Sequence, residues 1–587
     1  MKNTIILFFI SLVGFLFVLQ GCEDLSVGND FLEKPPSVDV TQDSIFAKAE
    51  FAERFLWGAY ESLPYGLPIT WGDRTDEMGM DIQASLSDIN HSFLNWGGVN
   101  QLYYSGQYTS GVENSNGKTK YSYNNSGAWD GIRDAHIFIE NVDRVPDMTA
   151  EQASRLKAEA RMIKALHYTD MFRHFGGLPW IDRAYTANED FNVPRMTSMA
   201  TMDSIVATID KAIPDLPFAI EDKLNWEGRF TQAAAMGLKA RVLLFGASPL
   251  FNDNQPFMEG EAADKMMVWH GGFDSNLWKR AADAAKELID KVEQTGDYSL
   301  VNTGNPEQDF KTAYYDRGNS ELLISTRARY RAPGFWSGQF YFFQATRYGI
   351  GATTQNYVDM FPMMNGLSIT DPNSGYDPDN PYENRDPRLY QTVLVNGAPY
   401  KNRQAELWIG GRERRNINTN STASGYKLRK FILDENSATQ SVIQWPYLRL
   451  AEIYLTYAEA LNEFNDGPTP EAYLYVNKVR ERAGVGELPQ GLSKEEFRKA
   501  VLNERAIEFG YEKVRWFDIV RWKMDQNFTK TLEGMNIRKQ GDGSFTYERF
   551  ELPSRYWQGN WSPKWYLSAF PPNEINKGYG LVQNPGW

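Results

Sequence analysis

The chain has little of several features on which common functional classes depend. It has a single cysteine in 587 residues, so no disulfide can form within the chain and the fold must depend on its packed core. It has only five histidines, and His167 and His174 are too far apart along the chain for the i,i+4 pairing of a helical zinc site. The net charge of −14 argues against nucleic acid as a partner, because such binding needs a basic surface.

Sequence motifs of the common catalytic classes are also absent. The chain contains no G-x-S-x-G nucleophile elbow, no H-E-x-x-H zinc motif and no P-loop. Carboxylates are plentiful, as in any acidic protein, and none is singled out by its spacing. No motif of these classes therefore indicates an enzyme, and we expect no cofactor.

Only one long hydrophobic run is present, at residues 5–19, directly after the basic start Met1-Lys2-Asn3. It is shorter than the roughly 20 residues that cross a bilayer, and its flanks are typical of an export signal. The run ends in Leu19-Gln20-Gly21-Cys22, which resembles a bacterial lipobox. We therefore expect a signal peptide over residues 1–21 and a lipid-modified Cys22; the alternative is an ordinary secretory signal with a chance cysteine.

Aromatic residues are unusually abundant, at 14% of the chain with 17 Trp and 31 Tyr. Many lie in polar loops, as in Trp71-Gly72-Asp73, Asn95-Trp96-Gly97-Gly98 and Gly334-Phe335-Trp336-Ser337-Gly338. The apolar C–H face of a pyranose can lie on a flat ring, while its hydroxyl groups need polar side chains at the edges. This pattern favours a sugar-binding surface, although the same rings could simply pin the loops to the rest of the fold.

Helix start and stop signals recur along most of the chain. Capping boxes open helices at Thr149 with Gln152 and at Ser493 with Glu496. Further helices are predicted over residues 44–63, 233–247, 277–294 and 447–464, and after Thr469-Pro470.

The residue composition changes between about residues 302 and 444, where Gly, Pro, Asn and Asp dominate and short β-type runs occur. We predict a mainly α protein: a tetratricopeptide-like scaffold of helical pairs, or degenerate α-solenoid, with a large loop-rich insert containing short β-strands. The expected divisions are a lipid anchor and tether over 22–43, a helical region over 44–301, the insert over 302–444, which we expect to contribute to ligand binding, and a second helical region over 445–587.

Several segments in chain order resemble the SusD/RagB family, the nutrient-binding surface lipoproteins of Bacteroidetes. They include Ala158-Glu159-Ala160-Arg161, Lys239-Ala240-Arg241, Tyr457-Ala458-Glu459-Ala460, Arg515-Trp516-Phe517-Asp518 with Arg521-Trp522, Phe570-Pro571-Pro572-Asn573 and Gln583-Asn584-Pro585-Gly586-Trp587. The chain departs from the family pattern at Lys513, where glycine is usual after the glutamate at 512. We expect Arg515, Asp518 and Arg521 to form buried ion pairs, because isolated buried charges are costly.

The resemblance implies a lipid-anchored outer-membrane protein that faces the cell exterior, with Glu23 and Asp24 resembling the export signal. It implies a non-enzymatic role: capture of a poly- or oligosaccharide and delivery to a SusC-like TonB-dependent transporter, on which the protein acts as a lid. Two alternatives stay open. One is a RagB-like lid that binds oligopeptides, and the other is an architectural lid with no ligand preference of its own.

The family resemblance also implies where the ligand binds, by region and not by motif. The two regions are the segment after the first helix and the loop-rich insert. The expected ligand-binding residues are Trp71, Asp73, Asp81, Trp96, Asn100, Tyr103, Tyr104, Arg327, Phe335, Trp336, Gln339 and Tyr341.

A separate oxygen-rich loop holds Asp371, Asn373, Asp377 and Asp379. These residue types can bind Ca²⁺, although the loop lacks the bidentate glutamate that closes an EF-hand loop. Local Asx turns explain the same residues, and we prefer that interpretation.

The lipobox generates a direct prediction. Replacement of Cys22 by alanine removes the acylated sulfur, so the protein should leave the membrane fraction and should no longer incorporate labelled palmitate. Fractionation of cells that express the wild type or Cys22→Ala measures this. Equal membrane retention of both forms would contradict lipid anchoring through Cys22.

Overall fold

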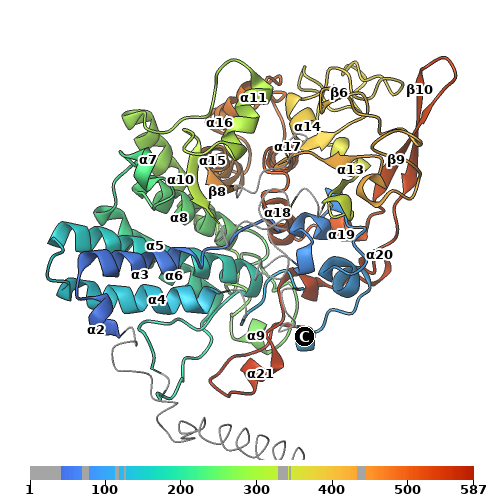
Figure 1. Cartoon of the computed structure of the whole chain (residues 1–587). Coiled ribbons are helices and arrows are strands. Elements are labelled where there is room, and N and C mark those ends of the chain that lie inside the picture. Colours follow the sequence, from blue (N-terminus) through green and yellow to red (C-terminus); the bar gives the residue numbers. More distant parts are fainter. Residues whose placement is uncertain are drawn as a thin grey trace, which may run out of the picture.

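The computed structural model describes residues 41–68, 78–112, 118–124, 127–186, 188–327, 342, 346–432 and 444–587. Within these residues the protein is a stack of helices that carries a loop-rich lobe on one side (Figure 1). No helix of the described part is both long and apolar enough to span a bilayer. This is the mainly helical architecture that the sequence predicts.

The stack is built by successive pairing of helices. Contacts run from α3 (Ala49–Tyr60) through α4, α5, α6, α8 and α10 to α15 (Leu450–Phe464), which also packs on α16 and α17. The N-terminal helices are α2 (Gln42–Ile45), α4 (Ala128–Asn141), α5 (Ala150–Phe175), α6 (Ser198–Ala212), α7 (Lys223–Trp226), α8 (Gln232–Ala247), α9 (Glu261–Asp264), α10 (Asn276–Thr295) and α11 (Pro306–Tyr315). The C-terminal ones are α16 (Pro470–Arg482), α17 (Lys494–Glu508), α18 (Arg515–Arg521), α19 (Gln526–Thr529), α20 (Trp557–Asn560) and α21 (Pro572–Ile575).

Local capping signals fix the helix ends as predicted. The Thr149 hydroxyl accepts from the Gln152 N–H and the Gln152 side chain reaches back, which completes a capping box, and Ser493 with Glu496 does the same. The helix α5 ends at Gly176, whose φ of +80° suits glycine.

The predicted helix over residues 447–464 is correct only from Leu450 onward. Residues Trp445–Arg449 form strand β8, which pairs antiparallel with β2 (Leu322–Thr326). Tertiary pairing overrides the helical pattern here, because β8 directly follows the insert and pairs with β2 from the first part of the insert. A Cβ at Gly237 of α8 would lie 2.8 Å from the Leu448 side chain, so a glycine lets this ladder pack directly on the helix.

The insert leaves the stack after α10 and returns to it at α15, and it forms the lobe at the upper right of Figure 1. Its sheets within the described residues are all two-stranded and antiparallel. Its short elements are β3 (Ala352–Thr353), α13 (Gln355–Val358), α14 (Pro387–Thr392), β4 (Val393–Leu394), β5 (Pro399–Tyr400), β6 (Arg403–Gln404) and β7 (Lys427–Leu428). The hairpin of β9 (Glu533–Lys539) and β10 (Phe545–Glu551) projects beside it.

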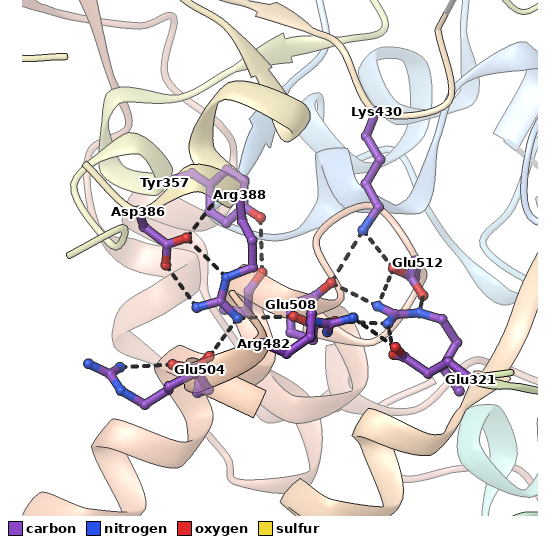
Figure 2. Close-up of polar contacts among 12 residues, drawn as sticks. Glu321, Tyr357, Asp386, Arg388, Lys430, Arg482, Glu504, Glu508 and Glu512 are labelled. Carbon is purple, nitrogen blue, oxygen red and sulfur yellow. Dashed lines mark hydrogen bonds and ion pairs between the residues drawn. The ribbon is translucent and has the colours of Figure 1, made fainter. Parts of the chain in front are cut away.

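A buried ion network fastens the insert to the helices (Figure 2). The Glu508 carboxylate of α17 receives Arg449 at 2.8 Å, Arg482 at 2.5 Å and Arg388 of the insert at 3.0 Å. The Arg388 guanidinium also binds Asp386 at 2.8 Å. All of these side chains are at most 1% exposed, so the pairs are shielded from solvent and salt.

The network extends on both sides and is balanced in charge. Its further pairs are Arg388–Glu504, Arg480–Glu504, Arg482–Glu321, Arg449–Glu321, Arg449–Glu512 and Lys430–Glu512, at 2.6–3.0 Å. The cations Arg388, Lys430, Arg449, Arg480 and Arg482 face the carboxylates Glu321, Asp386, Glu504, Glu508 and Glu512, which makes five of each. Such a network is tolerable in the interior only because every charge is paired.

The predicted pairing of the signature residues is confirmed. The Arg515 guanidinium binds Asp88 at 2.9 Å, and Asp518 receives Arg505 at 2.9 Å and Arg521 at 2.8 Å. Burial disfavours ionisation of the Asp518 carboxyl, but these two arginines overcome it and hold its pKa below the usual value. The signature is therefore structural.

The network predicts a stability cost for losing one carboxylate. Glu508→Gln keeps the shape but leaves an unbalanced positive charge, so the free energy of unfolding at pH 7 should fall by about 3–5 kcal/mol. Urea unfolding of both proteins measures this. The exposed strand residue Glu548 supplies the control Glu548→Gln, which should change stability by less than about 0.5 kcal/mol.

The same variant should alter the response to acid. Burial opposes ionisation of Glu508, but Arg482, Arg449 and Arg388 hold the pKa of its carboxyl well below the usual value. Its stabilisation is therefore complete above the unfolded-state pKa of about 4.3 and is lost as the pH falls below that value. Wild-type stability should drop more steeply than that of Glu508→Gln below about pH 4.5; parallel curves would contradict the ionised network.

Candidate functional site

Two segments far apart in the sequence meet where β1 (Asn90–His91) pairs with β3. The register joins Asn90 to Thr353 and His91 to Ala352. Beyond the pair, the N–H of Phe93 donates to the carbonyl of Gly349 at 2.9 Å. The loop after β1, from the segment that follows the first helix, therefore lies against the part of the insert that precedes β3.

This junction brings Trp96 and Tyr348 together as an aromatic pair on the surface. Their ring centroids are 6.1 Å apart and the planes are inclined by 69°, which is an edge-on arrangement. The Tyr348 side chain is 41% exposed, and Trp96 is half-buried. Gly349 has a φ of +100° and a Cβ there would lie 2.8 Å from that of Phe93, so glycine is needed for this close approach.

Polar side chains behind the rings shape the loop that carries Trp96. The Asn100 amide donates to the carbonyls of Ser92 and Leu94, both at 3.1 Å. The buried Asp81 carboxylate accepts the N–H of Ile82 at 2.9 Å and the hydroxyl of Ser92. Both predicted residues therefore lie behind this site, where Asn100 bonds the loop itself and Asp81 links the loop to Ile82 and Ser85.

The predicted rings of Tyr103 and Tyr104 are buried in the core. Tyr103 is 1% exposed and stacks on Tyr108 at 5.0 Å between centroids, while the Tyr104 hydroxyl donates to the Ser85 carbonyl at 2.7 Å. We expected Asp81, Tyr103 and Tyr104 to contact the ligand. The structure instead places all three behind the surface, because Tyr103 packs on Tyr108 and both Tyr104 and Asp81 make buried hydrogen bonds.

The buried imidazole of His91 adds no positive charge behind the site at neutral pH. Burial lowers the pKa of His91 to about 4, so its imidazole is neutral and its Nε2–H donates to the Pro553 carbonyl at 3.0 Å. Burial also raises the pKa of Tyr104. The site thus offers the Trp96 ring, on a loop held by hydrogen bonds of Asn100 and Asp81, and the Tyr348 ring of the facing segment of the insert.

Arg327 lies in a different hollow. It borders a groove of about 600 Å³ with Trp57 and Trp226, and none of the lining residues belongs to the Trp96–Tyr348 pair. Its guanidinium is 3.1 Å from the Glu227 carboxylate. Burial lowers the pKa of this guanidinium. Of the predicted ligand-binding residues that the structure describes, Asp81, Trp96, Asn100, Tyr103 and Tyr104 do not line this groove.

Several predicted residues lie outside the described part of the chain and stay predictions. They are the lipidation site Cys22 and the ligand-binding candidates Trp71, Asp73, Phe335, Trp336, Gln339 and Tyr341.

The oxygen-rich loop forms Asx turns. The Asp371 carboxylate accepts the N–H of Asn373 at 2.8 Å, and Asp377 accepts the N–H of Asp379 at 2.9 Å. Within the described residues, no group of three or more acidic, His or Cys side chains is arranged to hold a metal ion. The Asx turns agree with the preferred interpretation, and calcium binding by this loop stays an untested prediction.

Sequence reasoning missed Tyr348, Trp57 and Trp226. Trp226 sits in the run Asn225-Trp226-Glu227-Gly228, the same mixture of an aromatic with polar and glycine residues that marked the other loops. Trp57 stands in a helical pattern, where an aromatic is usually a core residue. Only tertiary contacts, Trp57 with Trp226 and Tyr348 with Trp96, distinguish these aromatics from ordinary core or loop residues.

Comparison with known proteins agrees with the residue pattern. The model described as "SusD family" matches residues 325–587, and one described as "Starch-binding associating with outer membrane" matches residues 30–244. The two matches lie in separate parts of the chain and include both segments of the aromatic site. The chain belongs to the SusD/RagB family.

Individual relatives are distant but cover nearly the whole chain. "SusD-like protein P2" of Formosa agariphila is 24% identical over 532 residues, which are 88% of this chain and 90% of that protein. A crystal structure of a SusD-like protein from Bacteroides fragilis has a TM-score of 0.72 at 20% identity and covers 94% of this chain and 100% of its own. A solved protein described as a laminarin-binding SusD-like protein has a TM-score of 0.57 at 19% identity, with 92% and 100% covered.

Proposed function

We propose that the protein is a lipid-anchored carbohydrate-binding protein of the outer membrane that faces the cell exterior. It captures a poly- or oligosaccharide and delivers it to a SusC-like TonB-dependent transporter, as the lid of that transporter. Its role is binding and not catalysis. The observation that carries the proposal is the Trp96–Tyr348 ring pair, which two distant segments place together at the surface.

The geometry suits a pyranose ring. The apolar face of a sugar can lie on the exposed Tyr348 ring, while the edge-on Trp96 indole closes one side. Because hydrogen bonds of Asn100 and Asp81 hold the loop, little ordering entropy is lost on binding. A relative that carries the name laminarin-binding supports a glycan as the ligand.

The expected affinity is low. Two rings at about 0.5–1.5 kcal/mol each, with a few hydrogen bonds at about 1 kcal/mol net, correspond to dissociation constants between millimolar and micromolar. Weak binding suits a protein that must release its ligand. A polymer compensates through repeated contacts.

Affinity electrophoresis of the lipid-free domain through gels that contain a panel of polysaccharides tests the glycan site. Tyr348→Ala removes an exposed ring and should weaken retardation by the bound glycan roughly 2- to 10-fold, and Trp96→Ala should act alike. Phe273→Ala is the matched control, because this ring is 54% exposed and lies on a separate loop. Thermal unfolding of each variant establishes that it is folded.

Wild-type retardation by no polysaccharide would contradict the glycan proposal. Binding to an oligopeptide library instead would favour the peptide-importing alternative, and binding to neither would favour an architectural lid. If retardation is unchanged in both Tyr348→Ala and Trp96→Ala, the glycan proposal stands, but the Trp96–Tyr348 pair is not the binding site.

The transporter proposal rests on the family and has its own test. The full-length protein with a C-terminal affinity tag, extracted from native outer membranes in mild detergent, should co-purify with one large TonB-dependent barrel protein. Cys22→Ala should yield less of this complex, because the anchor holds both proteins on one membrane. Recovery of the tagged protein alone after chemical cross-linking in intact cells would contradict the partnership.

A further inference from the structure

Two tryptophans line the groove that Arg327 borders. Trp57 lies near the end of α3 and Trp226 is the last residue of α7, and their ring centroids are 6.1 Å apart with planes only 30° from parallel. The Trp226 side chain is 39% exposed, and Trp57 is half-buried. Tryptophan rarely stays this exposed without a partner, since its large apolar surface gains from burial.

A buried ion pair holds both indoles in place. The Arg229 guanidinium lies 5.2 Å from the Trp57 ring centroid and 4.8 Å from that of Trp226. It is fixed in turn by the fully buried Glu159, which accepts from Arg229 Nε at 3.0 Å and from the Tyr60 hydroxyl at 2.9 Å. The two rings are therefore ordered before any ligand arrives, which reduces the entropic cost of binding.

Polar groups stand at one edge of the groove. The Glu227 carboxylate lies 3.1 Å from the Arg327 guanidinium and 3.3 Å from that of Arg317. Glu227 Oε1 and Arg327 Nε are buried, yet neither has a hydrogen-bond partner among the residues that the structure describes. Buried polar atoms without partners are costly, so a ligand hydroxyl or a water that enters as this edge opens would be bound favourably.

The charges at the groove indicate an uncharged ligand. Arg317 and Arg327 share Glu227, Arg229 is paired with Glu159, and Glu61 also lines the groove, so the charges of opposite sign balance and neither sign dominates. Flat apolar rings beside paired donors and acceptors match a pyranose, which has a C–H face and hydroxyl edges. The backbone at Gly228 adds space, since a Cβ there would have no contact closer than 3.8 Å.

We propose that the Trp57–Trp226 groove is a second carbohydrate-binding site, which takes pyranose rings of a neutral polysaccharide and acts beside the Trp96–Tyr348 site. This inference rests on the proposed glycan-binding function. Two sites on one protein make the second contact with a long chain intramolecular, so polymers are held more tightly than short oligosaccharides.

The experiment compares a polymer with a short fragment of the same glycan. Affinity electrophoresis in the polysaccharide that retards the wild type measures polymer binding, and calorimetry with a di- or trisaccharide of that polymer measures single-site binding. Trp226→Ala should weaken polymer retardation roughly 2- to 10-fold, since it removes one ring platform. Trp57→Ala should do the same, while Trp226→Phe should retain most of the retardation.

Short-fragment binding distinguishes the two sites. In Tyr348→Ala the fragment should still bind weakly through the groove, and in the double variant Tyr348→Ala/Trp226→Ala both polymer and fragment binding should vanish. Phe273→Ala again serves as the exposed-ring control. Trp226 lies on a four-residue helix at the surface, and thermal unfolding establishes that its variants keep the wild-type fold.

Wild-type retardation in both Trp226→Ala and Trp57→Ala, with loss in Tyr348→Ala, would overturn the second site and leave the proposed function standing. Loss of all polymer binding in Tyr348→Ala alone would also overturn it. Absence of any retardation of the wild type would overturn the second site together with the glycan proposal.

Discussion

Three arginines from different parts of the chain meet on the carboxylate of Glu508. Arg449 stands where the chain re-enters the helical stack, Arg482 ends α16, and Arg388 belongs to the insert. Buried charges tolerate little displacement, because an unpaired charge in the interior costs several kcal/mol. The network therefore does more than add stability: it fixes where a loop-rich lobe of low regular structure sits on a rigid scaffold (Figures 1 and 2).

The same network leads directly to the aromatic site. Tyr511 precedes Glu512, and its hydroxyl contacts Thr353 at 2.7 Å and Asn90 at 3.2 Å, one residue on each strand of the β1–β3 junction. That junction places Trp96 beside Tyr348. Buried polar contacts thus position a ligand site that is made of two loop segments, and its rings need little rearrangement on binding.

The sequence predicted what local chemistry determines. The capping box at Thr149, for example, needs only neighbouring residues, and the structure has it as expected. Prediction from the sequence failed where contacts between distant residues determine the structure. Residues of β8 pair with β2 instead of extending α15, and the ring of Tyr103 is buried against Tyr108 and C-terminal aromatics. Lys513 connects the two levels. It has a φ of +60°, a conformation that favours glycine, which explains why glycine is usual there in the family.

The account's central claim is that Trp96 and Tyr348, held together across the chain, form a sugar platform. The most direct measurement is a crystal structure of the protein soaked with the shortest oligosaccharide of a polysaccharide that it retains. We predict a pyranose ring in van der Waals contact with the Tyr348 ring and beside the Trp96 indole. An ordered sugar elsewhere on the surface, with both rings uncovered, would contradict the claim.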